Sequence, residues 1–244
     1  MKRYIVYSIF CLIFFVGDIY GQHGHSDHGH SDIEFAYQNG MVDIEFGPEG
    51  RVFEGEFPTS GTDLQFTTEP GFASETSEGM GIGSGDQIVY NVLDNLLFWN
   101  GSSIAAPTAG TQIRIGNIPP TVPDTVVSGT SGSQPGSFSP AANRVGAADG
   151  TGDFHADLDW FLEPNTGNPG TGAYAVKLNL STSAAGIANS DDFFIVYNFG
   201  LDDTEFEEGV EAFAALVPEP STMMIVGVGI LLSGLMWRKQ PVRR

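Results

Sequence analysis

Hydrophobic and polar positions alternate with a period of two residues along many short stretches of the chain, which is typical of β-strands with one buried face. The pattern predicts strands within residues 33–37, 42–46, 51–57, 111–118, 154–162, 174–180 and 192–199. Residues 86–94 and 96–99 are the most apolar stretch of the body, where length does not decide between strand and helix, and their β-branched and aromatic content favours strand. Residues 58–85 are expected to be loop with at most short strands, and residues 121–152, rich in Ser, Gly, Thr, Pro and Ala, a long exposed loop or inter-sheet connection. The chain is therefore predicted to be mostly β, with an antiparallel β-sandwich ectodomain.

The best-defined strand pair is a hairpin around Asn39–Gly40. This dipeptide favours a two-residue type I′ turn, because both central positions need φ > 0. The turn fixes a register in which Phe35 faces Ile44 on the apolar side, and Glu34 faces Glu45 on the other side. Like charges directly opposite one another destabilise a strand pair, so this second face suits a cation. Continued back along the first strand, the face carries His30, Asp32, Glu34, Asp43 and Glu45. We expect Glu34, Asp43 and Glu45 to supply a negative field or outer ligands.

One helix is predicted late in the chain, over residues 202–215. Phe206, Val210 and Phe213 recur at helical spacing behind an acidic first turn, and Val217-Pro-Glu-Pro220 stops the helix. The pattern indicates a single amphipathic helix that packs its apolar side on the strands.

The two ends of the chain differ from the body. Residues 1–21 have a basic start and an apolar stretch too short to span a bilayer, which predicts a secretory signal peptide. Residues 222–236 are apolar and precede a basic tail, which predicts a C-terminal transmembrane helix. Cys11 is the only cysteine and lies in the signal peptide, so the mature protein has no disulfide or thiolate metal site. Residues 33–216 are expected to form one ectodomain.

The body of the chain is strongly acidic. The whole sequence carries 30 Asp and Glu against 10 Lys and Arg, for a net charge of −20. The basic residues between the two end segments are Arg51, Arg114, Arg144 and Lys177. A body of this charge repels nucleic acid and anionic lipid and suits cations. Nucleic-acid binding is therefore excluded as a function.

A histidine-rich segment, residues 22–32, leads into the hairpin. The sequence His-Gly-His-Ser-Asp occurs twice in tandem there and contributes His23, His25, His28 and His30. Imidazole is a good ligand for zinc, copper and nickel, so the segment is a candidate metal site; the alternative is a hydrated tail that binds metal adventitiously. Because only the neutral imidazole binds metal, binding should weaken as the pH falls through about 6.5.

His155, Asp157 and Asp159 share one face of the predicted strand at 154–162. His155 and Asp157 are further candidate ligands, and they can form one composite site with the N-terminal histidines if the hairpin lies beside this strand. A pair of carboxylates can also perform acid–base chemistry, which makes a metallohydrolase a minor alternative. The chain has no G-x-S-x-G, H-E-x-x-H or P-loop motif, and we expect a protein without enzymatic activity.

The C-terminal segment, residues 217–244, resembles the PEP-CTERM sorting signal of Gram-negative bacteria. It has a Pro-Glu-Pro motif at Pro218, Glu219 and Pro220, then the apolar run and Trp237-Arg-Lys. The resemblance implies recognition by a membrane-embedded exosortase, with an intermediate held in the inner membrane. Export to the cell surface or to an exopolysaccharide matrix would follow.

The body looks like a group of PEP-CTERM proteins, best known in cyanobacteria, whose expression is repressed by the zinc-uptake regulator. The similar segments are Asp32-Ile-Glu-Phe-Ala-Tyr, Val89-Tyr-Asn-Val-Leu, Leu97-Phe-Trp-Asn-Gly101, Phe154-His-Ala-Asp and Phe194-Ile-Val-Tyr-Asn-Phe-Gly-Leu-Asp202. The resemblance implies a role at the cell surface under zinc shortage, with histidines at both ends as ligands. In this chain the second group of histidines that the resemblance implies consists of His155 alone, and Asp157 and Asp159 stand where further histidines are expected.

These observations predict an exported surface protein that binds a divalent metal, with zinc expected, through His23, His25, His28 and His30, together with Asp32, His155 and Asp157. The alternative is a structural or adhesive matrix protein in which metal binding is incidental. In that case Trp99 and Trp160 are candidate platforms for stacking on sugars, although both can equally belong to the core.

Overall fold

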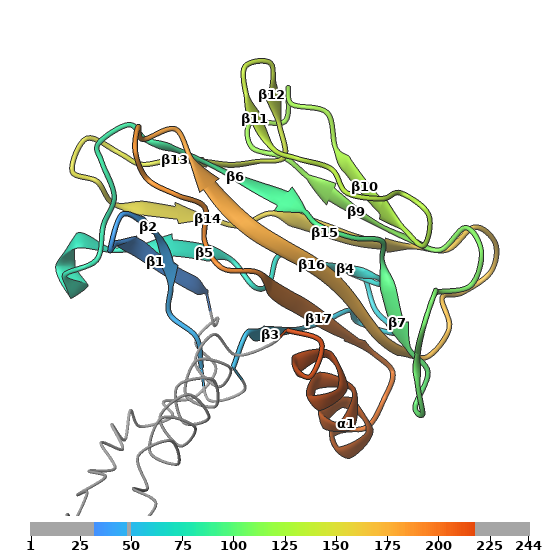
Figure 1. The fold of residues 1–244 in the computed structure, drawn as a ribbon. Coiled ribbons are helices and arrows are strands. Elements are labelled where there is room, and N and C mark those ends of the chain that lie inside the picture. The colour runs from blue at the N-terminus through green and yellow to red at the C-terminus, as the bar shows by residue number, and fades with distance from the viewer. Residues whose placement is uncertain (1–31, 48–49, 218–244) are drawn as a thin grey trace, which may run out of the picture.

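The computed structural model describes residues 32–47 and 50–217, which form a mostly β structure with one α-helix (Figure 1). A large sheet crosses the molecule in the order β13 (Arg144–Ala147), β6 (Gln87–Val92), β16 (Gly172–Thr182), β17 (Phe193–Phe199) and β3 (Val52–Glu56). Strand β7 (Leu97–Trp99) joins it beside β16 and pairs in turn with β8 (Ile104–Ala105).

Two four-stranded sheets lie against this large sheet. The β1 sheet has the order β14 (Phe154–Ala156), β5 (Phe72–Ser74), β1 (Ile33–Gln38) and β2 (Met41–Ile44). The β9 sheet has the order β10 (Thr125–Ser128), β9 (Gln112–Gly116), β15 (Asp159–Glu163) and β4 (Phe66–Thr67). A small hairpin, β11 (Ser137–Phe138) with β12 (Ala141–Ala142), and a 3₁₀ turn, η1 (Thr76–Glu78), complete these elements.

The side chains of the large sheet alternate between two apolar layers. On β16, Tyr174 and Val176 face the main core, which also contains Phe35 of the β1 sheet and Trp160 of the β9 sheet. The ring centroids of Trp160 and Tyr197 lie 5.4 Å apart and join the β9 sheet to β17 across this core. Ala173 and Ala175, which alternate with Tyr174 and Val176 on β16, face the other way, toward α1 (Asp203–Ala214). The order of layers is therefore helix, large sheet, main core and the two smaller sheets.

The hairpin and the helix agree with the sequence-based predictions. Phe35 pairs with Ile44 and Tyr37 with Val42, and both Asn39 and Gly40 have positive φ, as a type I′ turn requires. The helix begins after Asp202, whose carboxylate accepts a hydrogen bond of 2.9 Å from the backbone N–H of Glu205 and so caps the first turn.

Two predictions about the strands are wrong. The sheets are not wholly antiparallel, because β1 pairs in parallel with β5, and β3 with β17. Both pairs are far apart in sequence, which supplies the long crossover that parallel strands need. Residues 121–152 are not all loop, since β10 and β13 lie within them and pair with β9 and β6. Strand β10 buries the side chains of Thr125 and Val127, and β13 buries only that of Val145, too few for a clear period in the sequence.

The remaining sequence-based predictions on organisation concern the chain ends and the domain limits. Within residues 32–47 and 50–217, no helix is both long enough and apolar enough to cross a membrane. The signal peptide, the histidine-rich segment up to residue 31 and the C-terminal helix lie outside the described residues. The boundaries of one ectodomain at 33–216 stay a prediction.

Candidate metal centre

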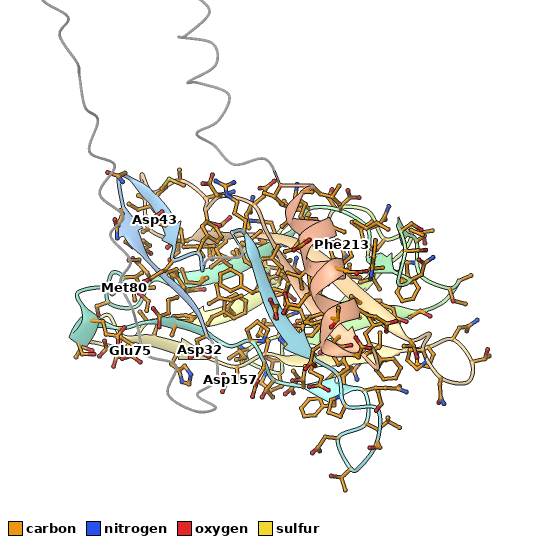
Figure 2. The ribbon with its side chains drawn as sticks, turned by 90° about the horizontal axis from the view of Figure 1, so that it is seen from below. Asp32, Asp43, Glu75, Met80, Asp157 and Phe213 are labelled. Carbon is orange, nitrogen blue, oxygen red and sulfur yellow. The ribbon has the colours of Figure 1, made fainter. Side chains whose placement is uncertain are left out.

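Asp32, His155 and Asp157 come together at one edge of the β1 sheet. The Nε2 atom of His155 lies 3.1 Å from Oδ2 of Asp32 and 3.8 Å from Oδ1 of Asp157. One ligand atom from each of the three residues lies within 4.8 Å of the others. Asp32 precedes β1 and Asp157 follows β14, and Figure 2 shows the two on the same side of the molecule. Three of the predicted ligand residues are therefore neighbours, although 123 positions separate Asp32 from His155.

The pairing of the strands explains this convergence. Strand β5 lies between β1 and β14, so that Ala73 pairs with Glu34 on one side and with His155 on the other. The next outward-facing row consists of Asp32, Gly71 and Asp157, because alternate residues of a strand face the same side. The backbone N–H of Ile33 donates a hydrogen bond of 2.8 Å to the carbonyl of Gly71, which carries the register out to this row. The hairpin and the strand at 154–156 are thus part of one sheet, as the composite site requires.

Small residues at the centre leave room between the charged ones. A Cβ atom on Gly71 would lie 2.5 Å from Oδ1 of Asp157 and 2.6 Å from Oδ1 of Asp32, closer than side chains pack. Glycine at this position therefore lets the two carboxylates approach each other over the middle strand. Sequence reasoning missed Gly71, because β5 has only three residues and lies in a region expected to be loop.

The three residues line a hollow of about 280 Å³, together with Thr68, Glu69 and Gly71. The side chain of Asp32 is 18% exposed, whereas those of His155 and Asp157 are 61% and 52% exposed. In a tetrahedral zinc site with bonds of about 2.0–2.2 Å, the ligand atoms are about 3.4 Å apart. The separations of 3.1 and 3.8 Å from His155 Nε2 lie on either side of that value. Two carboxylates and one imidazole in this spacing fit a transition-metal ion.

Two further hollows adjoin the first. His155 also lines a hollow of about 440 Å³ with Glu75, Asp149 and Asp153. Asp157 also lines a hollow of about 180 Å³ with Arg114, Asp159 and Phe161. His155 and Asp157 thus each line two of the three hollows. Three carboxylate side chains line each of the three hollows.

The predicted acidic face of the hairpin contributes charge near this centre. Glu34 lies in the row next to Asp32, and its pKa is raised above the ordinary 4.5 by burial first, and then by Glu78, Glu45, Asp32 and Glu75. Asp43 pairs with Ala36 and lies farther along the hairpin (Figure 2). Neither Glu34, Asp43 nor Glu45 belongs to the group of close ligand atoms found among the described residues. A role of these three carboxylates in supplying a negative field stays a prediction.

The remaining predicted site residues fall in two groups. His23, His25, His28 and His30, and the sorting residues Pro218, Glu219 and Pro220, lie outside the described residues. Trp99 and Trp160 are buried, at 9% and 0% exposure, and belong to the two apolar layers. The interpretation of these tryptophans as sugar-stacking platforms is therefore wrong, because neither ring face is open to a ligand.

Comparison with known proteins identifies the end of the chain. Residues 216–244 match the family model of the PEP-CTERM protein-sorting motif, which confirms the predicted sorting signal. The motif implies recognition by an exosortase and export with a sorting step anchored at the membrane. Neither a curated protein nor a solved structure matches the chain. The resemblance of the body to proteins repressed by the zinc-uptake regulator stays a prediction.

Proposed function

We propose that this exported protein captures a divalent metal ion, with zinc as the preferred ion, at Asp32, His155 and Asp157, and that it acts at the cell surface without catalysing a reaction. The convergence of these three side chains within 4.8 Å carries the proposal. Gly71 supports it, because the absence of a side chain there keeps the space between the two carboxylates open.

The donor set favours zinc over calcium and magnesium. Calcium and magnesium prefer oxygen ligands alone, whereas zinc accepts imidazole nitrogen together with carboxylate oxygen. Three protein ligands leave at least one coordination position free. The histidine-rich segment is joined directly to Asp32, with His30 two residues upstream, and can supply further imidazoles.

The destination agrees with such a role. The sorting motif directs the chain to export, and a metal-binding protein retained outside the cytoplasm would hold zinc near the cell surface when zinc is scarce. A final location at the surface or in an exopolysaccharide matrix, and the control by the zinc-uptake regulator, belong to this proposal.

The test is calorimetric titration of the full chain in detergent with zinc, copper and calcium at pH 7.5. We expect zinc to bind in the submicromolar range at a fixed stoichiometry. His155→Ala and Asp157→Asn should each weaken binding about tenfold or more, because each removes a ligand. Asp159→Asn is the matched control, since it removes the same charge from an exposed position on the same face but outside the cluster. Its affinity should stay within about twofold of the wild type.

The same titrations contain the contrary outcome. Zinc binding that survives His155→Ala and Asp157→Asn, or weak binding at many sites without selectivity among the three metals, would overturn the proposal. The protein would then be best described as a matrix-associated structural protein in which metal binding is incidental.

A further inference from the structure

We propose that the outward face of the β9 sheet binds a neutral sugar chain, at the hollow that Arg114 and Phe161 line. The ligand class is an oligosaccharide or polysaccharide of hexoses with free hydroxyl groups and no acidic groups. This inference goes beyond the proposed metal binding and does not depend on it.

One row of side chains crosses the four strands of this sheet. Its members, from β10 to β4, are Val126, Arg114, Phe161 and Phe66. Their neighbours along the strands, such as Ile113 and Trp160, are buried in the main core, so the row faces outward. Val126 is 36% exposed, and the other three members are partly exposed. Neighbouring apolar side chains left partly exposed on one face are a feature of ligand-binding surfaces.

The guanidinium group of Arg114 is fixed on the ring of Phe161. Its Cζ atom lies 3.8 Å from the ring centroid, and the ring centroid of Phe66 lies 4.9 Å from that of Phe161. Arg114 donates a hydrogen bond through Nε to Glu163 over 2.6 Å and another through Nη1 to Asp124 over 2.8 Å. These bonds within the described residues leave the N–H groups of Nη2 to donate to a ligand. A planar donor that is held in place beforehand loses little conformational freedom on binding.

The hollow beside this stack has a volume of about 180 Å³ and both apolar and polar walls. Phe161, Ile118 and Pro120 supply apolar surface. The charged side chains of the lining are those of Arg114, Asp124, Asp157 and Asp159. Gly116 pairs with Asp159 and puts no side chain into this space; a Cβ atom there would lie 3.1 Å from the Cβ of Asp159. The hollow therefore has room for a single sugar ring.

The chemistry of these walls fits a neutral sugar. A sugar ring has C–H groups that pack on an aromatic or aliphatic wall, and hydroxyl groups that donate to carboxylates and accept from a guanidinium. Three carboxylates against one guanidinium repel an acidic sugar and leave acceptors for hydroxyl donors. A basic peptide fits less well, because the guanidinium of Arg114 already lies over the ring of Phe161, where a cation of the peptide would bind.

The test is calorimetry of the full chain, in a detergent without sugar groups and with a chelator present. The ligands are neutral oligosaccharides of glucose, galactose and mannose, an oligogalacturonate and a lysine-rich peptide. We expect at least one neutral oligosaccharide to bind at a single site per chain, and the oligogalacturonate not to bind. Phe161→Leu and Arg114→Gln should each weaken the binding of the sugar about tenfold or more, because each removes one wall of the hollow.

The matched controls are Phe46→Leu and Arg51→Gln. Arg51 also lies over a phenyl ring, with its Cζ atom 5.5 Å from the ring centroid of Phe46, and it forms an ion pair with Asp191. Neither Phe46 nor Arg51 lines the hollow. Both control variants should bind the sugar within about twofold of the wild type, because each changes a site away from the ligand.

Four outcomes would overturn the inference. They are the failure of every neutral oligosaccharide to bind, tighter binding of the oligogalacturonate, sugar binding that survives both Phe161→Leu and Arg114→Gln, and a lysine-rich peptide that displaces the sugar. Because the chelator removes metal ions from the solution, none of these outcomes depends on the proposed metal site.

Discussion

Two sheets of this protein have small residues in the middle of an outward face, but a helix covers one face and the other stays open. On the large sheet, Ala175 pairs with Val196 and Ala173 with Trp99, and Phe206, Val210 and Phe213 of α1 belong to the same apolar layer. On the β1 sheet, Gly71 and Ala73 are flanked by Asp32, Glu34, His155 and Asp157, and the face carries a hollow.

The side chains beside the small residues decide whether such a face is covered or stays open. Small residues on a central strand create room above the sheet in both places. Apolar neighbours make it favourable to fill that room with a helix, because burial removes apolar surface from water. Charged neighbours cannot be buried without partners, so the room stays open to water and cations. The first face contributes stability and the second contributes a candidate site.

The largest expected effect comes from breaking the helix-covered face. Phe213 is fully buried, and its ring centroid lies 5.7 Å from that of Phe194. Phe213→Ala should lower the free energy of unfolding by about 3–5 kcal/mol, through lost burial and the cavity that remains. Urea unfolding followed by circular dichroism measures this, with the partly exposed Phe66→Ala as a control that should cost less. Zinc affinity of the folded Phe213→Ala protein should stay within about twofold of the wild type, and a larger change would mean that the two faces are coupled.

A smaller but more specific effect is expected at Gly71. Gly71→Ala would put a Cβ atom 2.5 and 2.6 Å from oxygens of Asp157 and Asp32, so that the carboxylates must separate. We expect zinc affinity to fall about tenfold, and the free energy of unfolding to fall by about 1–3 kcal/mol from overpacking. Calorimetry and urea unfolding give the two values.

The control for this change is another glycine. Gly150→Ala meets no atom within 4 Å and should change neither the affinity nor the stability appreciably. If Gly71→Ala binds zinc as well as the wild type, the spacing of the two carboxylates is not what forms the site.

Part of this arrangement could be predicted from the sequence. The hairpin register followed from Asn39–Gly40, and the shared face of His155 and Asp157 followed from the period of two residues, because both signals are local. The meeting of Asp32 with His155 could be stated only as a condition, because it depends on β5, a three-residue strand too short to give a hydrophobic pattern. The parallel pairing of β1 with β5 is equally a property of the whole fold.

The open face also has an electrostatic cost that the covered face lacks. Burial, Glu78, Glu45, Asp32 and Glu75 raise the pKa of Glu34 above the 4.5 of an unfolded chain. The folded state therefore holds this proton more tightly than the unfolded state does. Stability must fall as the pH rises from about 4.5 through the raised pKa, because the unfolded state binds fewer protons in that window.

The smallest predicted effect follows from this charge. In the presence of a chelator, Glu34→Gln should raise the free energy of unfolding at pH 7 by about 0.2–1 kcal/mol, the usual cost of like charges across a strand pair. The gain should vanish at pH 3, where the carboxyl group of Glu34 is protonated in both states. Urea unfolding at the two pH values measures it, with the exposed Glu56→Gln on β3 as a control that should change little. A Glu34→Gln protein that is less stable than the wild type at pH 7 would show that the carboxylate is stabilised by its surroundings, and that the open face carries no such cost.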